Sequence, residues 1–162
     1  MTTSRPDASF LFTHPAHLVA FGFGSGLAPR APGTVGTLLG WPLYWLIVAV
    51  ASSTGAQCAL IAAAFVVGIW ACARTGRALG VADHGGIVWD EIVAFALVLL
   101  FTPAGWLWAG LAFALFRLFD ILKPWPIRYF DARLKNGFGV MFDDLLAAGF
   151  SIAVMKGVAW LV

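Results

Sequence analysis

Five carboxylate side chains border segments of this chain that are otherwise apolar. Asp90 and Glu91 open one apolar segment, Asp143 and Asp144 open another, and Asp120 closes a third. An acid in the first turn of a helix stabilises the helix by about 0.3 to 1 kcal/mol, which accounts for one acid of each pair. The second acid of a pair adds repulsion and a desolvation cost. Helix capping therefore explains only part of this pattern.

Asp120 fits helix capping least well, because a helix dipole disfavours an anion in the last turn. Arg117 and Lys123 lie three residues away on either side and partly offset that penalty. A divalent cation would neutralise several carboxylates at once. Hard oxygen ligands with few histidines select Mg²⁺, or Mn²⁺, over zinc. The sequence therefore predicts a metal site held by Asp90, Glu91, Asp120, Asp143 and Asp144, with Arg117 and Lys123 balancing charge or binding a phosphate group.

The composition places these acids in a membrane protein. The chain has 162 residues, of which 61% are hydrophobic and 11% charged, and its mean hydropathy is +0.90. Soluble domains carry about 25% charged residues. No basic, aromatic-rich patch indicates nucleic-acid binding, and the N-terminal stretch lacks the pattern of a removable signal peptide. Cys58 and Cys72 share one apolar segment and would be about 21 Å apart in a helix, too far for a disulfide.

Five apolar segments organise the chain, near residues 35–53, 57–73, 88–102, 106–120 and 142–162. We predict an all-α fold: a polytopic membrane bundle of about four to five apolar helices with a glycine-rich N-terminal loop. Residues 1–162 form one membrane-embedded domain, with 1–20 as an approach segment. The third and fourth segments are too short to cross a bilayer comfortably, and the turn at 102–105 returns the chain to the side from which it came.

Basic residues indicate which side of the membrane carries the acids. Alternate crossings put residues 1–34, 74–86 and 121–140 on one side, together with all five acids. Every Lys and Arg in a predicted loop or tail falls on that side, which the positive-inside rule assigns to the cytoplasm. Lys156 lies near the opposite face, where its long side chain can reach the interface. The basic loop residues are Arg5, Arg30, Arg74, Arg77, Lys123, Arg128, Arg133 and Lys135.

The glycine-rich stretch from Phe21 to Thr37 lies on the same side as the acids. It lacks the P-loop pattern, and its glycines alone fit a phosphate cradle, a re-entrant loop or a connector. "PGTVGT" is typical of a helix start, with Thr34 as the predicted N-cap and free backbone N–H groups that suit an anion. His84, in "ADHGG", fits either a proton carrier or phosphate contact, or a turn-stabilising residue.

Four stretches together resemble the phosphatidylglycerophosphatase A family: "FGSGLAPRAPGTVGTLLG", "DHGGIVWDEIVAF", "FRLFDILKPWPIRYFD" and "GFGVMFDDLLAAG". Their order and approximate spacing match that family over nearly the whole chain. The resemblance implies an Mg²⁺-dependent enzyme of the bacterial inner membrane that hydrolyses phosphatidylglycerophosphate to phosphatidylglycerol and inorganic phosphate. It assigns family motif positions to Gly33, Thr34, Gly36, Thr37, Asp90, Glu91, Arg117, Asp120, Lys123, Pro124, Asp143 and Asp144.

The expected mechanism follows from the metal site and this resemblance together. The five acids hold one or two Mg²⁺ ions, which grip the phosphomonoester and activate a water, while Lys123, Arg117 and the N–H groups near Thr34 stabilise the phosphate oxygens. Two other functions remain open on sequence. A CDP-alcohol-type phosphotransferase would need the D-x-x-D-G-x-x-A-R string, which is absent. A small transporter or channel would need ionisable groups near the middle of the apolar segments, and those parts have none.

Overall fold

The computed structural model describes residues 6–161, and these residues form helices and connecting turns with no strand. The all-α prediction is confirmed. Arg5, which the charge pattern assigned to the cytoplasmic side, lies outside the described residues. The elements are α1 (Ala8–Phe12), α2 (Pro15–Ala20), the 3-10 helix η1 (Gly22–Leu27), α3 (Pro32–Leu38), α4 (Gly40–Val50), α5 (Thr54–Leu79), α6 (Trp89–Leu100), α7 (Trp106–Leu122), α8 (Ile127–Arg133) and α9 (Gly137–Leu161).

Three helical stretches among the described residues are long and apolar enough to cross a membrane: Pro32–Val50, Thr54–Leu79 and Gly137–Leu161. The first joins α3 and α4 end to end. Helix α6 has 12 residues and α7 has 17, so they extend about 18 and 26 Å, short of a hydrocarbon core of about 30 Å. A membrane helical protein is therefore supported, with three candidate crossings where the sequence predicted four to five apolar helices.

The short helix α6 lies at the centre of the bundle. It packs against α3, α4, α5, α7 and α9, and nine of its residues are buried: Trp89, Asp90, Ile92, Val93, Ala94, Phe95, Ala96, Val98 and Leu99. The other helices enclose most of its apolar side chains. This enclosure brings the two acids of its first turn within reach of several other elements.

The outer helices present apolar side chains to the surroundings. Trp45 and Leu46 of α4, Val66 of α5 and Leu107 of α7 are all exposed, as are many of their neighbours. So large an apolar surface is typical of helices that face lipid. Lys156, near the far end of α9, lies over the ring of Phe101, with 5.8 Å from Nζ to the ring centre.

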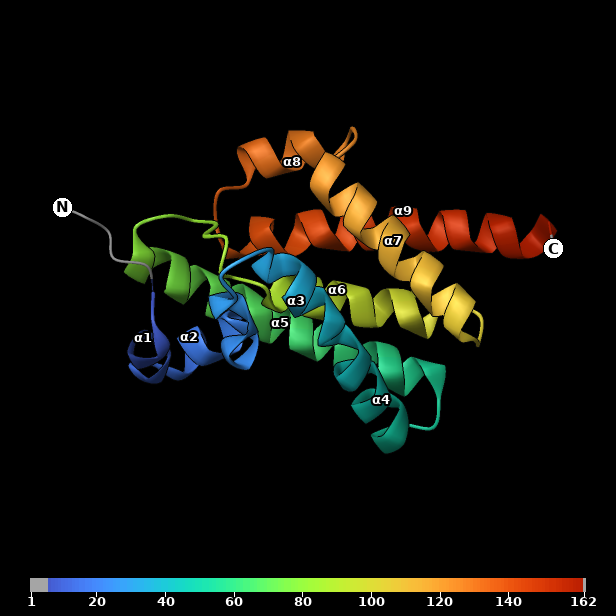
Figure 1. Ribbon diagram of the computed structural model, residues 1–162, viewed down its shortest axis with the longest axis horizontal. Coiled ribbons are helices and arrows are strands. Elements are labelled where there is room, and N and C mark those ends of the chain that lie inside the picture. The colour runs from blue at the N-terminus through green and yellow to red at the C-terminus, as the bar shows by residue number, and fades with distance from the viewer. Residues whose placement is uncertain (1–5, 162) are drawn as a thin grey trace.

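The connections divide between the two ends of the bundle (Figure 1). The α4–α5 and α6–α7 connections lie toward the right of the view with the C-terminal end of α9, while α8 and the α5–α6 loop lie toward the left. The long loop predicted between α7 and α9 contains a helix of its own, α8. The connections between successive long helices thus alternate between the two ends of the bundle.

Several helix bounds differ from prediction. Helix α5 continues to Leu79, so Arg74 and Arg77 lie in its last turns and not in a loop. Helix α9 begins at Gly137, so Asp143 and Asp144 lie in its second turn and do not open it. Apolar composition located both helices. Their ends contain polar residues, however, and hydropathy does not show that the helix continues through these. Both cysteines are free, as expected.

Candidate active site

The first turn of α6 is held firmly against its neighbours. The backbone N–H of Val88 donates to the carbonyl of Ala20 in α2 at 2.9 Å, and the indole N–H of Trp89 donates to the carbonyl of Ala64 in α5 at 3.0 Å. These two bonds fix the direction in which the next residues point. Asp90 and Glu91, which follow at once, therefore enter the bundle from a rigid position at the helix start.

Helix α3 approaches Glu91 closely because two of its residues are glycines. A Cβ atom on Gly33 would overlap the carboxylate of Glu91, and one on Gly36 would lie 2.6 Å from Cβ of Val88. The helix starts at Pro32 with Ala31 as its N-cap, in a left-handed conformation with φ of 47°. The prediction of Thr34 as the N-cap is therefore wrong: Pro32 occupies the first helical position, so the helix begins three residues earlier than predicted.

Arg117 of α7 joins three elements at this point. Its Nη1 lies 2.8 Å from the Glu91 carboxylate and 2.6 Å from that of Asp120. The same nitrogen donates to the hydroxyl of Thr37 at 3.3 Å, and that hydroxyl donates in turn to the carbonyl of Gly33 at 2.8 Å. Asp120 thus has the counter-ion that its place in the last turn of α7 requires. The guanidinium also ties the glycine-threonine motif of α3 to the acids.

Lys123 forms a second charged group at the C-cap of α7, where its φ is 42°. Its ammonium pairs with Asp143 of α9 and lies 3.2 Å from Asp131 of α8. Burial opposes the charged ammonium, but the two carboxylates outweigh it and raise the pKa of Lys123. Partial burial likewise opposes ionisation of Asp131, and Lys123 and Lys135 outweigh it and lower its pKa. Lys123 therefore stays protonated throughout the physiological range.

Asp90 and Asp144 differ from the other predicted ligands because neither forms an ion pair within the described residues, and each has a buried carboxylate oxygen without a hydrogen-bond partner. Their exposed fractions are 7% and 3%. The charge of Asp144 interacts with those of Asp120, Asp90, Asp143 and Glu91. Two buried carboxylates that form no salt bridge are costly. This arrangement favours a positively charged ligand between α6 and α9.

The donor atoms fit a hard cation. Asp90 Oδ1, Glu91 Oε2, Asp143 Oδ1 and Asp144 Oδ2 are all buried and lack a hydrogen-bond partner. Buried polar atoms are nearly always paired, so four unpaired oxygens in one cluster suit Mg²⁺. In residues 6–161, however, no three His, Cys, Asp or Glu side chains converge into a finished ligand set. Glu91, Asp120 and Asp143, which pair with Arg117 or Lys123, would have to turn away from these cations to bind an ion together with Asp90 and Asp144.

The remaining predicted site residues lie at the edge of this cluster or outside it. Thr37 is buried beside Arg117, while Thr34 is partly exposed one turn earlier in α3. His84 accepts the backbone N–H of Gly86 on Nδ1 at 3.0 Å, the turn-stabilising role that the sequence left open. It lines a separate cavity of about 390 Å³ together with Phe21 and Pro32.

Two acids near the cluster were not among the predicted site residues. Asp131, on α8, shares Lys123 with Asp143. Asp83, in the α5–α6 loop, interacts with the charges of Lys123, Asp131 and Asp120. Its side chain is exposed at the surface, yet the surrounding protein removes enough water to raise its pKa. Both residues stand in the motif stretches of the sequence, but only the fold brings them to the other acids.

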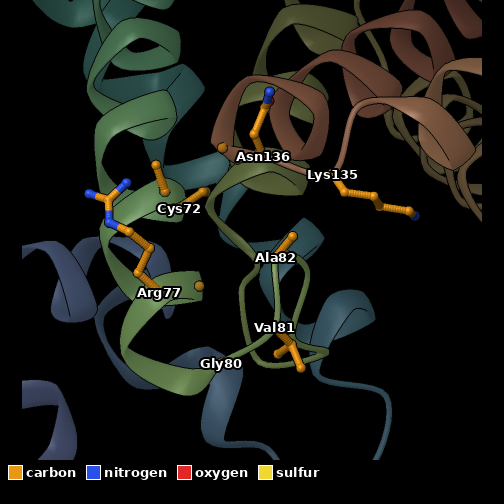
Figure 2. A pocket seen from close by; sticks show the side chains of 10 residues that line it. Cys72, Arg77, Gly80, Val81, Ala82, Lys135 and Asn136 are labelled. Carbon is orange, nitrogen blue, oxygen red and sulfur yellow. The ribbon is translucent and has the colours of Figure 1, made fainter.

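A further cavity lies beside the cluster, between the end of α5 and the start of α9 (Figure 2). It has a volume of about 280 Å³, and Cys72, Arg77, Ala82, Lys135 and Asn136 are among its lining residues. The side chains of Arg77 and Lys135 point away from each other on opposite sides of it. None of the five predicted ligands lines this cavity. The acids, and not this cavity, therefore define the candidate active site.

Comparison with known proteins shows the family to which the chain is similar. The family model described as "Phosphatidylglycerophosphatase A" matches residues 18–159. A Haemophilus influenzae protein named phosphatidylglycerophosphatase A is 47% identical, with 99% of this chain and 98% of that protein covered. The Escherichia coli protein of the same name is 38% identical, with 88% and 83% covered.

A third relative carries a different name. A Bacteroides thetaiotaomicron protein provisionally named phosphatidylinositol-3-phosphatase is 36% identical, with 90% of this chain and 94% of that protein covered. No solved structure matches the chain. The matched region contains all five acids together with Arg117 and Lys123. This chain belongs to the phosphatidylglycerophosphatase A family.

Proposed function

We propose that this protein hydrolyses the terminal phosphomonoester of phosphatidylglycerophosphate, giving phosphatidylglycerol and inorganic phosphate. The observation that carries the proposal is the match to two proteins named for this activity over most or nearly all of the chain. The buried acids supply the matching chemistry, because they gather from three helices at one end of an apolar bundle. A lipid headgroup reaches such a place while its tails stay in the bilayer.

The two cations of the site would bind the phosphate. Arg117 Nε is buried without a hydrogen-bond partner, so its N–H is available to a phosphate oxygen. Lys123 supplies a second positive charge six residues further along the chain, at the C-cap of α7. Positioned donors of this kind stabilise the charge that builds up on the phosphoryl oxygens, and each contributes about 100-fold or more in rate.

Asp90 and Asp144, with Glu91, Asp143 and Asp120, would hold Mg²⁺. Bound there, the ion lowers the pKa of water and offsets phosphate charge. The proton of the attacking water passes to a carboxylate without an ion pair, which points to Asp90 or Asp144. As the new bond from the water oxygen to phosphorus forms, the bond to the glycerol oxygen breaks. The glycerol oxygen takes up a proton and leaves as the alcohol of phosphatidylglycerol.

The location of the site is part of the proposal. The Lys and Arg residues of the α5–α6 side and of α8 lie at the same end as the acids, which favours a cytoplasmic face. The relatives are bacterial, which supports an inner-membrane location. The substrate would then be reached from the leaflet that faces the cytoplasm.

A substrate panel tests the reaction. Purified protein is given phosphatidylglycerophosphate, phosphatidylinositol 3-phosphate and glycerol 3-phosphate, and released phosphate is measured. We expect rapid release from the first, slower release from the second and least from the third. The name of the third relative makes the inositol lipid the necessary comparison. Preference for the inositol lipid, or for the soluble ester, would contradict the proposed substrate.

A further inference from the structure

We propose that one acyl chain of the lipid substrate lies in an apolar groove formed by α5, α6 and α9. The inference rests on the proposed function, since it names where the rest of that substrate binds. The groove has a volume of about 280 Å³. Its lining residues are Cys58, Ile61, Ala62, Phe65, Val66, Val93, Ala94, Leu97 and Leu145.

The groove begins directly beside the acids. Val93, Ala94 and Leu97 follow Asp90 by three, four and seven residues in α6, and this spacing puts them on the same helix face as Asp90. In α9, Leu145 follows Asp144 directly. A phosphate bound to a cation that Asp90 holds would therefore have the groove close by, because Val93 lies about 4.5 Å further along the helix axis than Asp90.

The groove also has the chemistry and access that an acyl chain needs. Every lining side chain is apolar except the Cys58 thiol. From Cys58 to Val66 it follows α5 for about 12 Å. A cavity of about 150 Å³ lined by apolar side chains is enough to bind benzene. Ala62 and Val66 are exposed, Val66 at 63%, so the groove opens outward to the space that lipid occupies.

The identity of the occupant follows from continuity with the acids. A detached fatty chain or a second protein has no reason to start at two buried carboxylates. A phospholipid whose headgroup is bound there must place its tails somewhere within the next few ångströms. The groove offers an apolar path from that point, so one tail of the bound lipid occupies it.

The test compares two phenylalanine substitutions one residue apart. Ala62→Phe would fill the groove, while Ala63→Phe adds the same bulk at an exposed position outside it. We expect Ala62→Phe to lower kcat/KM for dioleoyl phosphatidylglycerophosphate about tenfold relative to Ala63→Phe, because buried methylene contacts are lost. Hydrolysis of the deacylated headgroup should change less than about twofold. Equal effects of the two substitutions, or an equal loss on the headgroup, would overturn the inference.

A binding measurement keeps the inference testable apart from turnover. Cys58 lines the groove and Cys72 is fully buried, so maleimide labelling in mixed micelles reports on Cys58. A phosphonate analogue of dioleoyl phosphatidylglycerophosphate should slow this labelling at least about fivefold compared with phosphatidylcholine. Equal labelling rates with the two lipids would contradict the inference. Protection without any hydrolysis would instead reject the proposed function and leave the groove in place.

Discussion

At the scale of single residues, the five acids of this site fall into two groups, those that form an ion pair and those that do not. Glu91 and Asp120 pair with Arg117, and Asp143 pairs with Lys123. Asp90 and Asp144 are buried, form no salt bridge within the described residues, and each has a buried oxygen without a hydrogen-bond partner. The paired acids have a structural reason to be where they are. The unpaired two are costly to the fold and thus carry the strongest indication of a role in chemistry.

Asp90→Asn tests that distinction. The amide keeps the size of the side chain but removes its charge, so it should fold and insert normally. We expect phosphate release to fall at least about 100-fold, since a single electrostatic contributor acts on that scale. Asp131→Asn, which alters an acid at the partly exposed edge of the cluster, is the matched control and should lose less than about tenfold. A rate for Asp90→Asn within a few-fold of wild type would refute its role.

Asp120 allows a metal ligand to be distinguished from a counter-ion. The sequence predicts a ligand, and the structure gives it a 2.6 Å pair with Arg117. Phosphate release by Asp120→Asn is measured against Mg²⁺ concentration. If Asp120 binds the ion, half-maximal activity should need at least about tenfold more Mg²⁺, the scale of a lost ligand contact. If it serves only Arg117, the Mg²⁺ requirement stays unchanged while KM for the lipid rises.

At the scale of elements, the close contact between α3 and α6 positions the site. The sequence located both helices and the glycine-threonine motif, but it did not indicate what the glycines do. Gly33 and Gly36 allow α3 to reach Glu91 and Val88, and only tertiary packing reveals that. Spacing along the chain also missed Asp83 and Asp131, because a loop and a short helix return them to the acids. The periodicity of apolar residues predicts where helices form, but it does not predict which helices pack against each other.

Gly33→Ala tests this contact. The added methyl group would overlap the Glu91 carboxylate, so we expect loss of about 1 to 3 kcal/mol in stability and displacement of Glu91 from Arg117. Activity should fall at least about tenfold. Gly110→Ala in α7 meets no atom within 4 Å and should leave both thermal unfolding and activity near wild type. Equal behaviour of the two variants would show that α3 has room beside Glu91.

At the scale of the whole molecule, the bundle has one chemically active end. Composition alone predicted a membrane protein, and three candidate crossings agree with it. The sequence could not show that α6 is the enclosed centre, because a buried helix and a lipid-facing helix are equally apolar. Because the neighbouring helices surround α6, this helix is stable in the bundle although its 12 residues are too few to cross a bilayer.

Sidedness is tested with single cysteines in a variant that lacks Cys58 and Cys72. Ser52→Cys lies on the α4–α5 connection and Lys135→Cys just before α9, at opposite ends of the bundle. Both positions are exposed. In intact cells, an impermeant maleimide should label the cysteine at 52 and leave the one at 135 unlabelled until the cells are opened. The reverse pattern would place the acids on the outer face.

The requirement for a divalent cation is the most direct test of the account, because four buried oxygens without partners are its physical basis. Purified protein in mixed micelles is stripped with EDTA, and phosphate release from phosphatidylglycerophosphate is followed as Mg²⁺ is restored. We predict that release falls at least about 100-fold after chelation and recovers fully with Mg²⁺. Release that continues undiminished after exhaustive chelation would contradict a metal site among these acids.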